Sequence, residues 1–135
     1  MEQDLEKARE LYRQAAEHGY VPAQCNLGNL YYSGIGVEEN NEEAAKWFAL
    51  AAERRYPRAQ FLLGECFENG FGVEKGNEKA LELYRLSAEQ GYAPAQNRVG
   101  VFYYHGIVVE QDYPAAMEWF ERAAVYNEVR NFMKA

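Results

Sequence analysis

The residues that could carry chemistry are few and widely spaced. His18 and His105 are separated by several predicted helices, and neither belongs to an HxxxH or HExxH arrangement that could hold a metal. Cys25 and Cys66 do not form a CxxC pair, the spacing typical of zinc ligands and redox dithiols. The sequence therefore predicts no catalytic residue, no metal site and no cofactor, and we do not expect an enzyme.

The glycine pairs look like phosphate-binding loops only superficially. The pair Gly34 and Gly36 follows a predicted helix rather than a strand, lacks a Lys-Ser/Thr partner, and precedes Glu38 and Glu39, whose charges would repel phosphate. The formal net charge of −7 points the same way, because nucleic-acid binding requires clustered Lys and Arg. We predict no nucleic-acid partner.

No stretch has the composition of a targeting or membrane segment. The first residues, MEQDLEKARE, are charged where a signal peptide would be apolar, and the longest apolar runs are far too short to span a bilayer. We expect a soluble protein without a membrane partner. The compartment is not fixed by the sequence, although a cytoplasmic location is favoured.

The elements that position these residues follow a repeat of 36 residues, which superposes Ala23, Ala59 and Ala95. A fixed period of this size is typical of a solenoid of stacked units, each built from a pair of helices. We therefore predict an all-α fold, an α-solenoid of antiparallel helix pairs. Other positions that recur in register are Gln24, Gln60 and Gln96; Leu27, Leu63 and Val99; Gly28, Gly64 and Gly100; Tyr31, Phe67 and Tyr103; Gly34, Gly70 and Gly106; and Ala44, Ala80 and Ala116.

We predict a single solenoid domain over residues 1–135. Its parts are a half repeat with a second helix only at 4–18, full repeats at 22–57, 58–93 and 94–127, and a C-terminal cap or the start of a further repeat at 128–135. First helices are expected at about 22–33, 58–69 and 94–105. The second helix of the third repeat is expected to end near residue 126, where the period fades.

Several residues predict how the helices begin and end. Gly19 follows the half repeat and is suited to a left-handed C-cap. Asn40, with Glu43 three residues later, has the spacing of an N-cap and its N3 partner, and Asp112 is placed to cap the last second helix. Val37 is expected to plug the corner between the two helices of the first full repeat.

The second repeat differs from the first at two packing positions. Leu83 stands where the first repeat has Trp47, and Ser87 stands where it has Ala51. We interpret both as exchanges that a helix pair tolerates.

The two cysteines fall at unrelated positions of the repeat. Cys25 is equivalent to Phe61, and Cys66 is equivalent to Leu30 and Phe102. Because framework cysteines come in dense, regularly spaced sets, we predict two free thiols that replace large apolar residues.

The pattern AxxxLGxxYxxGxGV, followed by an alanine early in the second helix and an Ala-Ala pair near its end, resembles the Sel-one-like repeat. This family is a longer-looped relative of the tetratricopeptide repeat, and the match covers nearly the whole chain. The resemblance implies a right-handed superhelix of antiparallel helix pairs, used mainly as an adaptor or scaffold. In the first copy the matching residues are Ala23, Leu27, Gly28, Tyr31, Gly34, Gly36, Val37, Ala44, Trp47, Phe48, Ala51 and Ala52.

Three residues depart from this pattern in the loops. Arg55 replaces the glycine between repeats, and Gly76 stands where the third repeat has the capping Asp112. Val108 stands where the other copies have Gly36 and Gly72. The loop at Val108 must therefore bend differently or bear strain.

In related solenoids the first helix of each pair lines the concave face, which implies where a partner would bind. Positions of the first helices that are not used for packing would face this groove, and they vary between copies while the packing positions repeat. The predicted partner-binding residues are Asn29, Tyr32 and Ser33; Phe61, Glu65, Glu68 and Asn69; and Asn97, Val101, Tyr104 and His105.

The chemistry of this set suits a peptide or helix of a partner protein. Aromatic rings would anchor it, and Glu65 and Glu68 would select a basic segment. A plainer interpretation stays open for each residue. Tyr32 and Tyr104 would then simply cover the edge of the core, and the two glutamates would belong to an ordinary solvated face.

The leading functional hypothesis is a non-enzymatic scaffold for protein–protein interaction. The alternative is a structural module that forms homo-oligomers through its open solenoid ends. A stack of repeats exposes apolar surface at any end that lacks a polar cap. In that case Leu5 and Leu11 of one chain would pack against Phe132 and Met133 of another.

Overall fold

The computed structural model describes residues 2–35 and 38–134. Val37, the predicted plug of the helix corner, lies outside the described residues together with Gly36. The described residues form helices and connecting loops, with no strand among them. The helices are α1 (Glu2–Glu17), α2 (Val21–Ser33), α3 (Asn41–Glu53), α4 (Pro57–Asn69), α5 (Asn77–Glu89), α6 (Ala93–His105) and α7 (Tyr113–Lys134).

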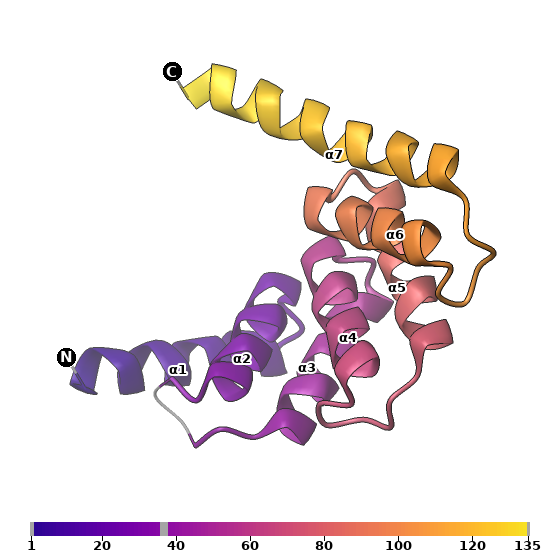
Figure 1. Ribbon diagram of the computed structural model, residues 1–135. Coiled ribbons are helices and arrows are strands. Elements are labelled where there is room, and N and C mark those ends of the chain that lie inside the picture. The colour runs from indigo at the N-terminus through magenta and orange to yellow at the C-terminus, as the bar shows by residue number, and fades with distance from the viewer. Residues whose placement is uncertain (1, 36–37, 135) are drawn as a thin grey trace.

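The helices follow one another along an arc, with α1 at one end and α7 at the other (Figure 1). The closest packing is between helices that are consecutive in the chain, so that α2 pairs with α3, α4 with α5, and α6 with α7. Buried side chains form several clusters along the stack rather than one central core. The predicted all-α solenoid is confirmed. Over the part of the chain that is described, no helix is both long and apolar enough to cross a membrane.

Small residues in the first helices allow aromatic rings of the second helices to approach closely. A methyl group added at Gly28 or Gly64 would lie 2.7 Å from the ring of Phe48 or Tyr84, respectively. At Gly100 it would lie 2.5 Å from the ring of Phe120. The recurring glycine therefore holds the two helices of each pair at a distance that no larger residue permits without a shift.

The predicted helix ends are confirmed by their geometry. Gly19 has a φ of 89°, in the left-handed region. The Asn40 side chain accepts a hydrogen bond of 3.1 Å from the Glu43 backbone N–H, and Asp112 accepts one of 3.0 Å from Ala115. These caps satisfy backbone donors that have no partner inside their own helix.

The two loop departures keep the backbone shape of the glycines they replace. Val108 has a φ of 68°, close to the 74° of Gly72. Arg55 has a φ of 63°, where Gly19 and Gly91 have 89°. The loop at Val108 therefore bears strain instead of bending differently, because a β-branched residue is disfavoured in the left-handed region.

The expected end of the last helix near residue 126 is wrong, because α7 continues to Lys134. At the earlier repeat boundaries a proline follows within three residues of the position that carries a positive φ, as Pro57 follows Arg55. No proline follows Asn127, which occupies the same position of the period. Nothing in the sequence therefore breaks the helix there, and residues 128–134 extend α7 rather than form a separate element.

Candidate functional site

The predicted partner-binding residues lie on α2, α4 and α6, and we call the surface that these helices carry the first-helix face. Electrostatic influence shows which of them come together. The pKa of Tyr32 is raised by burial and then by the charge of Glu65, and Glu65 is in turn influenced by Arg98 and Glu68. Tyr32 of repeat one and Arg98 of repeat three thus lie within electrostatic range of Glu65 in repeat two.

Glu68 belongs to a polar cluster that joins α4, α5 and α6. The Tyr84 hydroxyl donates a hydrogen bond of 2.7 Å to Glu68 Oε1, and Arg98 forms an ion pair with Glu68 Oε2. The Arg98 guanidinium also lies 5.8 Å from the Tyr84 ring centre and 5.9 Å from that of Phe102. Glu68 is therefore engaged within the molecule, where it connects repeat two to repeat three.

Burial sets the protonation behaviour of this cluster. Desolvation raises the pKa of Tyr84, and the hydrogen bond to Glu68 raises it further, so its hydroxyl stays protonated at neutral pH. Desolvation also raises the pKa of Glu65, and the charge of Glu68 adds to this while Arg98 opposes it. Within residues 2–35 and 38–134, the Glu65 carboxylate makes no ion pair. Glu65 is thus a poorly solvated charge on the first-helix face.

Two predicted aromatic anchors are also part of the core edge. The Tyr32 ring lies 6.3 Å from that of Phe48 and 5.9 Å from that of Phe71. Phe61 lies 5.6 Å from Tyr84. Both anchors are half-buried, so each ring stabilises its helix pair and still presents an edge to solvent.

Tyr104 and His105 form an exposed part of the predicted set. Tyr104 is 45% exposed, and its ring lies 5.1 Å from both His105 and Tyr113. The Asn69 amide donates a hydrogen bond of 3.0 Å to the Glu65 backbone carbonyl, so it is used within its own helix. Of the remaining predicted residues, Ser33 and Asn97 are exposed and Asn29 and Val101 are half-buried.

Two arginines of this face were missed by the sequence analysis. Arg98 pairs with Glu68, and Arg58 donates a hydrogen bond of 3.0 Å to Asn26 Oδ1. Arg98 lies next to the selected groove position Asn97, whereas Arg58 lies three residues before the selected Phe61. At each of the two positions the other repeats carry an uncharged residue, such as Leu62 or Pro22. An arginine at a position that is uncharged in the other repeats was the signal in the sequence that could have found these two residues. Of the two arginines, Arg98 offsets the charges of Glu65 and Glu68.

The cysteines are free and buried, as predicted. Burial raises the pKa of each thiol to about 11, partly offset at Cys25 by the charge of Arg58. Neither thiol is therefore ionised at neutral pH, and the thiol form is a poor nucleophile and a poor metal ligand.

Helix pairs that recur at a fixed period and pack mainly on their neighbours define this molecule as an α-solenoid repeat protein. A family model described as the Sel1 repeat matches residues 1–20, 21–56, 57–92 and 93–124. The chain therefore belongs to the Sel1 repeat family, which confirms the resemblance noted in the sequence. Proteins of this kind generally act as protein-interaction modules.

Solved structures share the fold. A protective antigen present in uropathogenic Escherichia coli strains is 38% identical, with a TM-score of 0.84, over 87% of this chain and 25% of that one. A Sel1 repeat protein from Oxalobacter formigenes is 34% identical, with a TM-score of 0.83, over 88% of this chain and 49% of that one. The Helicobacter pylori cysteine rich protein B is similar in fold, at 24% identity and a TM-score of 0.69, over 92% of this chain and 89% of that one.

The chain thus spans a quarter of the Escherichia coli antigen and about half of the Oxalobacter formigenes protein. A search of curated proteins finds no match.

Proposed function

We propose that this chain is a non-enzymatic scaffold that binds a peptide or helix of a partner protein in a concave groove lined by α2, α4 and α6. The observation that carries this proposal is the contrast between two sets of positions in the repeat. Gly28, Gly64 and Gly100 recur for packing, whereas the exposed or half-buried positions on the same helices carry different residue types. Such a contrast is expected of a constant scaffold with a specific surface.

The charges of the face define the partner further. Glu65 is half-buried and lacks an ion pair within the described ranges, so a partner cation placed beside it would regain favourable interactions. Arg58 and Arg98 lie on the same face and would repel a run of basic residues. The proposed partner segment therefore carries a single Lys or Arg that reaches Glu65, with apolar side chains that contact Phe61 and Tyr104.

The experiment starts with an affinity pull-down and mass spectrometry to identify the partner. Its affinity is then measured by calorimetry for the wild type, Glu65→Lys and Tyr104→Ala. We expect Glu65→Lys to weaken binding most, because it places a repelling cation on the face. Glu121→Lys, an equal charge change at an exposed position of α7, is the control. Unchanged affinity in both variants, with circular dichroism showing intact helices, would exclude the groove.

The absence of enzyme activity is part of this proposal. Cys25 and Cys66 are buried with raised pKa values, and His18 follows α1 whereas His105 is the last residue of α6. The proposed scaffold therefore uses neither cysteine as an activated nucleophile. Free thiols also suit the reducing compartment implied by a cytoplasmic location.

Self-association through the solenoid ends is the second candidate, and apolar exposure favours it. Leu11 on α1 is 55% exposed, and Phe132 near the end of α7 is 83% exposed. Light scattering over a range of protein concentrations tests this candidate. A strict monomer at every concentration would remove it and leave the groove proposal untouched.

A further inference from the structure

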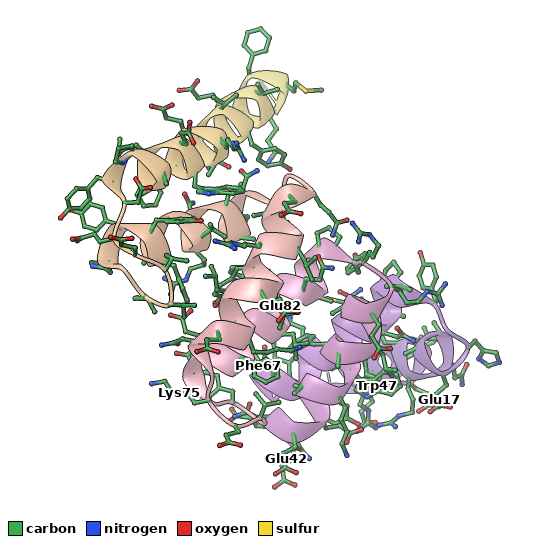
Figure 2. All side chains as sticks on the ribbon, turned by 90° about the vertical axis from the view of Figure 1, so that its right-hand side faces the viewer. Glu17, Glu42, Trp47, Phe67, Lys75 and Glu82 are labelled. Atoms are coloured by element: carbon green, nitrogen blue, oxygen red, sulfur yellow. The ribbon has the colours of Figure 1, made fainter. Side chains whose placement is uncertain are left out.

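A hollow of about 560 Å³ opens between α3 and α5, on the side of the molecule that these second helices form. We call this side the second-helix face. The floor of the hollow is apolar and includes Ala49 of α3, Phe67 of α4 and Leu83 of α5. Figure 2 shows Phe67 between Glu82 of α5 and Glu42 of α3, which belong to the rim. A concave and mainly apolar site with a few polar groups is typical of surfaces that bind a small group.

Three residues of the hollow differ from the residues at the equivalent positions one repeat earlier and one repeat later. These differences leave the space of the hollow open. The repeat provides an internal reference, since the same three positions occur between α1 and α3 and between α5 and α7. Ala49, Phe67 and Leu83 there correspond to Arg13, Tyr31 and Trp47 on one side and to Arg85, Tyr103 and Trp119 on the other.

At the neighbouring positions a guanidinium and a phenol fill the space. Arg13 Nη2 donates a hydrogen bond of 2.5 Å to the Tyr31 hydroxyl. Arg85 Nη2 donates one of 2.6 Å to the Tyr103 hydroxyl, and its guanidinium lies 5.7 Å from that ring centre. Ala49 cannot supply such a group and Phe67 offers no hydroxyl to receive it.

An indole ring is the other missing part. Trp47 packs against the buried cluster that includes Ala16 and Leu27, and Trp119 packs against the cluster that includes Ala80. Leu83 is much smaller than either tryptophan, so its position leaves the volume of a ring unfilled. At two equivalent sites of the same molecule, an indole ring and a guanidinium beside a phenol thus occupy this space.

We propose that the hollow binds a tryptophan side chain of a partner segment, with an Arg or Lys beside it. The rim supports the cation, because Glu42, Glu53 and Glu82 outnumber Lys46 and Lys79 there. Lys79 pairs with Glu82 at 4.0 Å, whereas Glu42 and Glu53 make no ion pair in the described part of the chain. An aromatic ring in an apolar hollow next to an arginine at its edge is the usual composition of a binding hot spot.

This site is independent of the groove proposed above. It lies on the second-helix face, is lined mainly by α3 and α5, and includes none of the predicted partner-binding residues. A partner could therefore contact either face alone, and a long partner could contact both.

The test is a titration with the amidated dipeptide N-acetyl-tryptophanyl-arginine, followed by NMR of the labelled protein. We expect shifts centred on Ala49, Phe67 and Leu83, and at least about tenfold weaker binding of the alanyl-arginine analogue. The variant Leu83→Trp should abolish binding because it supplies the missing ring. Leu50→Trp adds the same ring on α3 outside the hollow and is the matched control. Should Leu83→Trp not fold, Ala49→Arg blocks the same space.

Three outcomes would overturn the proposal. One is a lack of shifts at the hollow, and another is equal binding of the two dipeptides. The third is a concentration-dependent dimer that Leu83→Trp dissociates and Leu50→Trp does not, since a second copy would then be the occupant. The variant Glu65→Lys should bind the dipeptide as the wild type does, so failure here is distinguishable from failure of the groove.

Discussion

Repeat one packs on repeat two, and repeat two packs on repeat three, through helices at equivalent positions. We call these contacts the first and second interface. Their backbones follow the same plan, but their side chains have opposite character. Toward the first-helix face the first interface has Tyr32, Phe48 and Leu62 where the second has Glu68, Tyr84 and Arg98. Toward the second-helix face it has Ala49, Phe67 and Leu83 where the second has Arg85, Tyr103 and Trp119.

This difference shows that the residues that define the fold are distinct from the residues that give each interface its own chemistry. Gly64 and Ala80 are equivalent to Gly28 and Ala44, and these small residues bring the helices together in every copy. The six positions compared above can then carry side chains of different polarity or size without changing the backbone. A solenoid can therefore carry a charged contact at one interface and an open hollow at the next.

The largest effect is expected from breaking the charged contact of the second interface. Glu68→Ala removes the partner of both Arg98 and Tyr84, and we expect it to lower the free energy of unfolding by about 2 kcal/mol, the usual range for hydrogen bonds to charged groups. The side chains of Arg98 and Glu68 are 32% and 21% exposed, so water compensates part of the loss. Urea unfolding followed by circular dichroism measures the change.

Two further variants sharpen this prediction. Adding Arg98→Leu to Glu68→Ala should recover part of the loss, because it removes the unpaired cation and supplies the residue that the first interface has at that position. Glu65→Ala, one turn away on the same helix, should change stability much less than Glu68→Ala does. Equal effects of the two glutamate substitutions would mean that the cluster does not stabilise the second interface.

The next effect comes from exchanging the residues at the outer edge of the two interfaces. Trp119→Leu should lower the free energy of unfolding by about 2 kcal/mol, because it removes an indole ring that packs against the buried cluster containing Ala80. Leu83→Trp should raise it by about 1 kcal/mol, through additional apolar burial. Thermal and urea unfolding of both variants provide the measurement. A marked loss of stability in Leu83→Trp would show that the hollow cannot admit an indole ring.

A smaller effect is expected from relieving the strained loop of the third repeat. Val108 has a φ of 68°, a conformation that glycine adopts without strain at Gly72. We expect Val108→Gly to raise the free energy of unfolding by about 1 kcal/mol, after the entropy that glycine adds to the unfolded chain is subtracted. Val109→Gly, one residue further on, should destabilise instead. Differential scanning calorimetry tests the pair, and a loss of stability in Val108→Gly would contradict the interpretation as strain.

The sequence was sufficient to predict the fold because the fold depends on residues that recur. The predicted first helix at 22–33 begins only one residue away from the start of α2. Every copy has a glycine at the position of Gly28 and an aromatic residue at the position of Phe48, and close helix packing needs that combination. The end of α7 could not be found in this way, since the period fades there and no proline replaces the missing signal.

The sites depend on residues that do not recur, and for this reason they were predicted only in part. Groove positions were chosen by counting along each helix, which found Glu68 but not Arg98, its partner in the next repeat. The exchange at Leu83 was recognised and interpreted as harmless. It has a consequence only together with Ala49 and Phe67, which lie on two other helices. Contacts between repeats involve residues from different helices. A count along one helix does not show which of these residues meet.

The smallest effect concerns pH and the helix that both interfaces share. Burial raises the pKa of Glu65 above its ordinary value of 4.5, so the ionised carboxylate disfavours the folded state. The favourable contribution of protonated Glu65 is complete below that ordinary pKa and is lost as the pH rises through the raised value. Glu65→Gln should therefore stabilise the protein at pH 7, by less than about 0.5 kcal/mol, and make no difference near pH 4. Glu89→Gln, at an exposed position of α5, is the matched control for the loss of one carboxylate. Urea midpoints at the two pH values decide the matter, and an equal difference at both would mean that Glu65 is as well solvated in the folded chain as in the unfolded one.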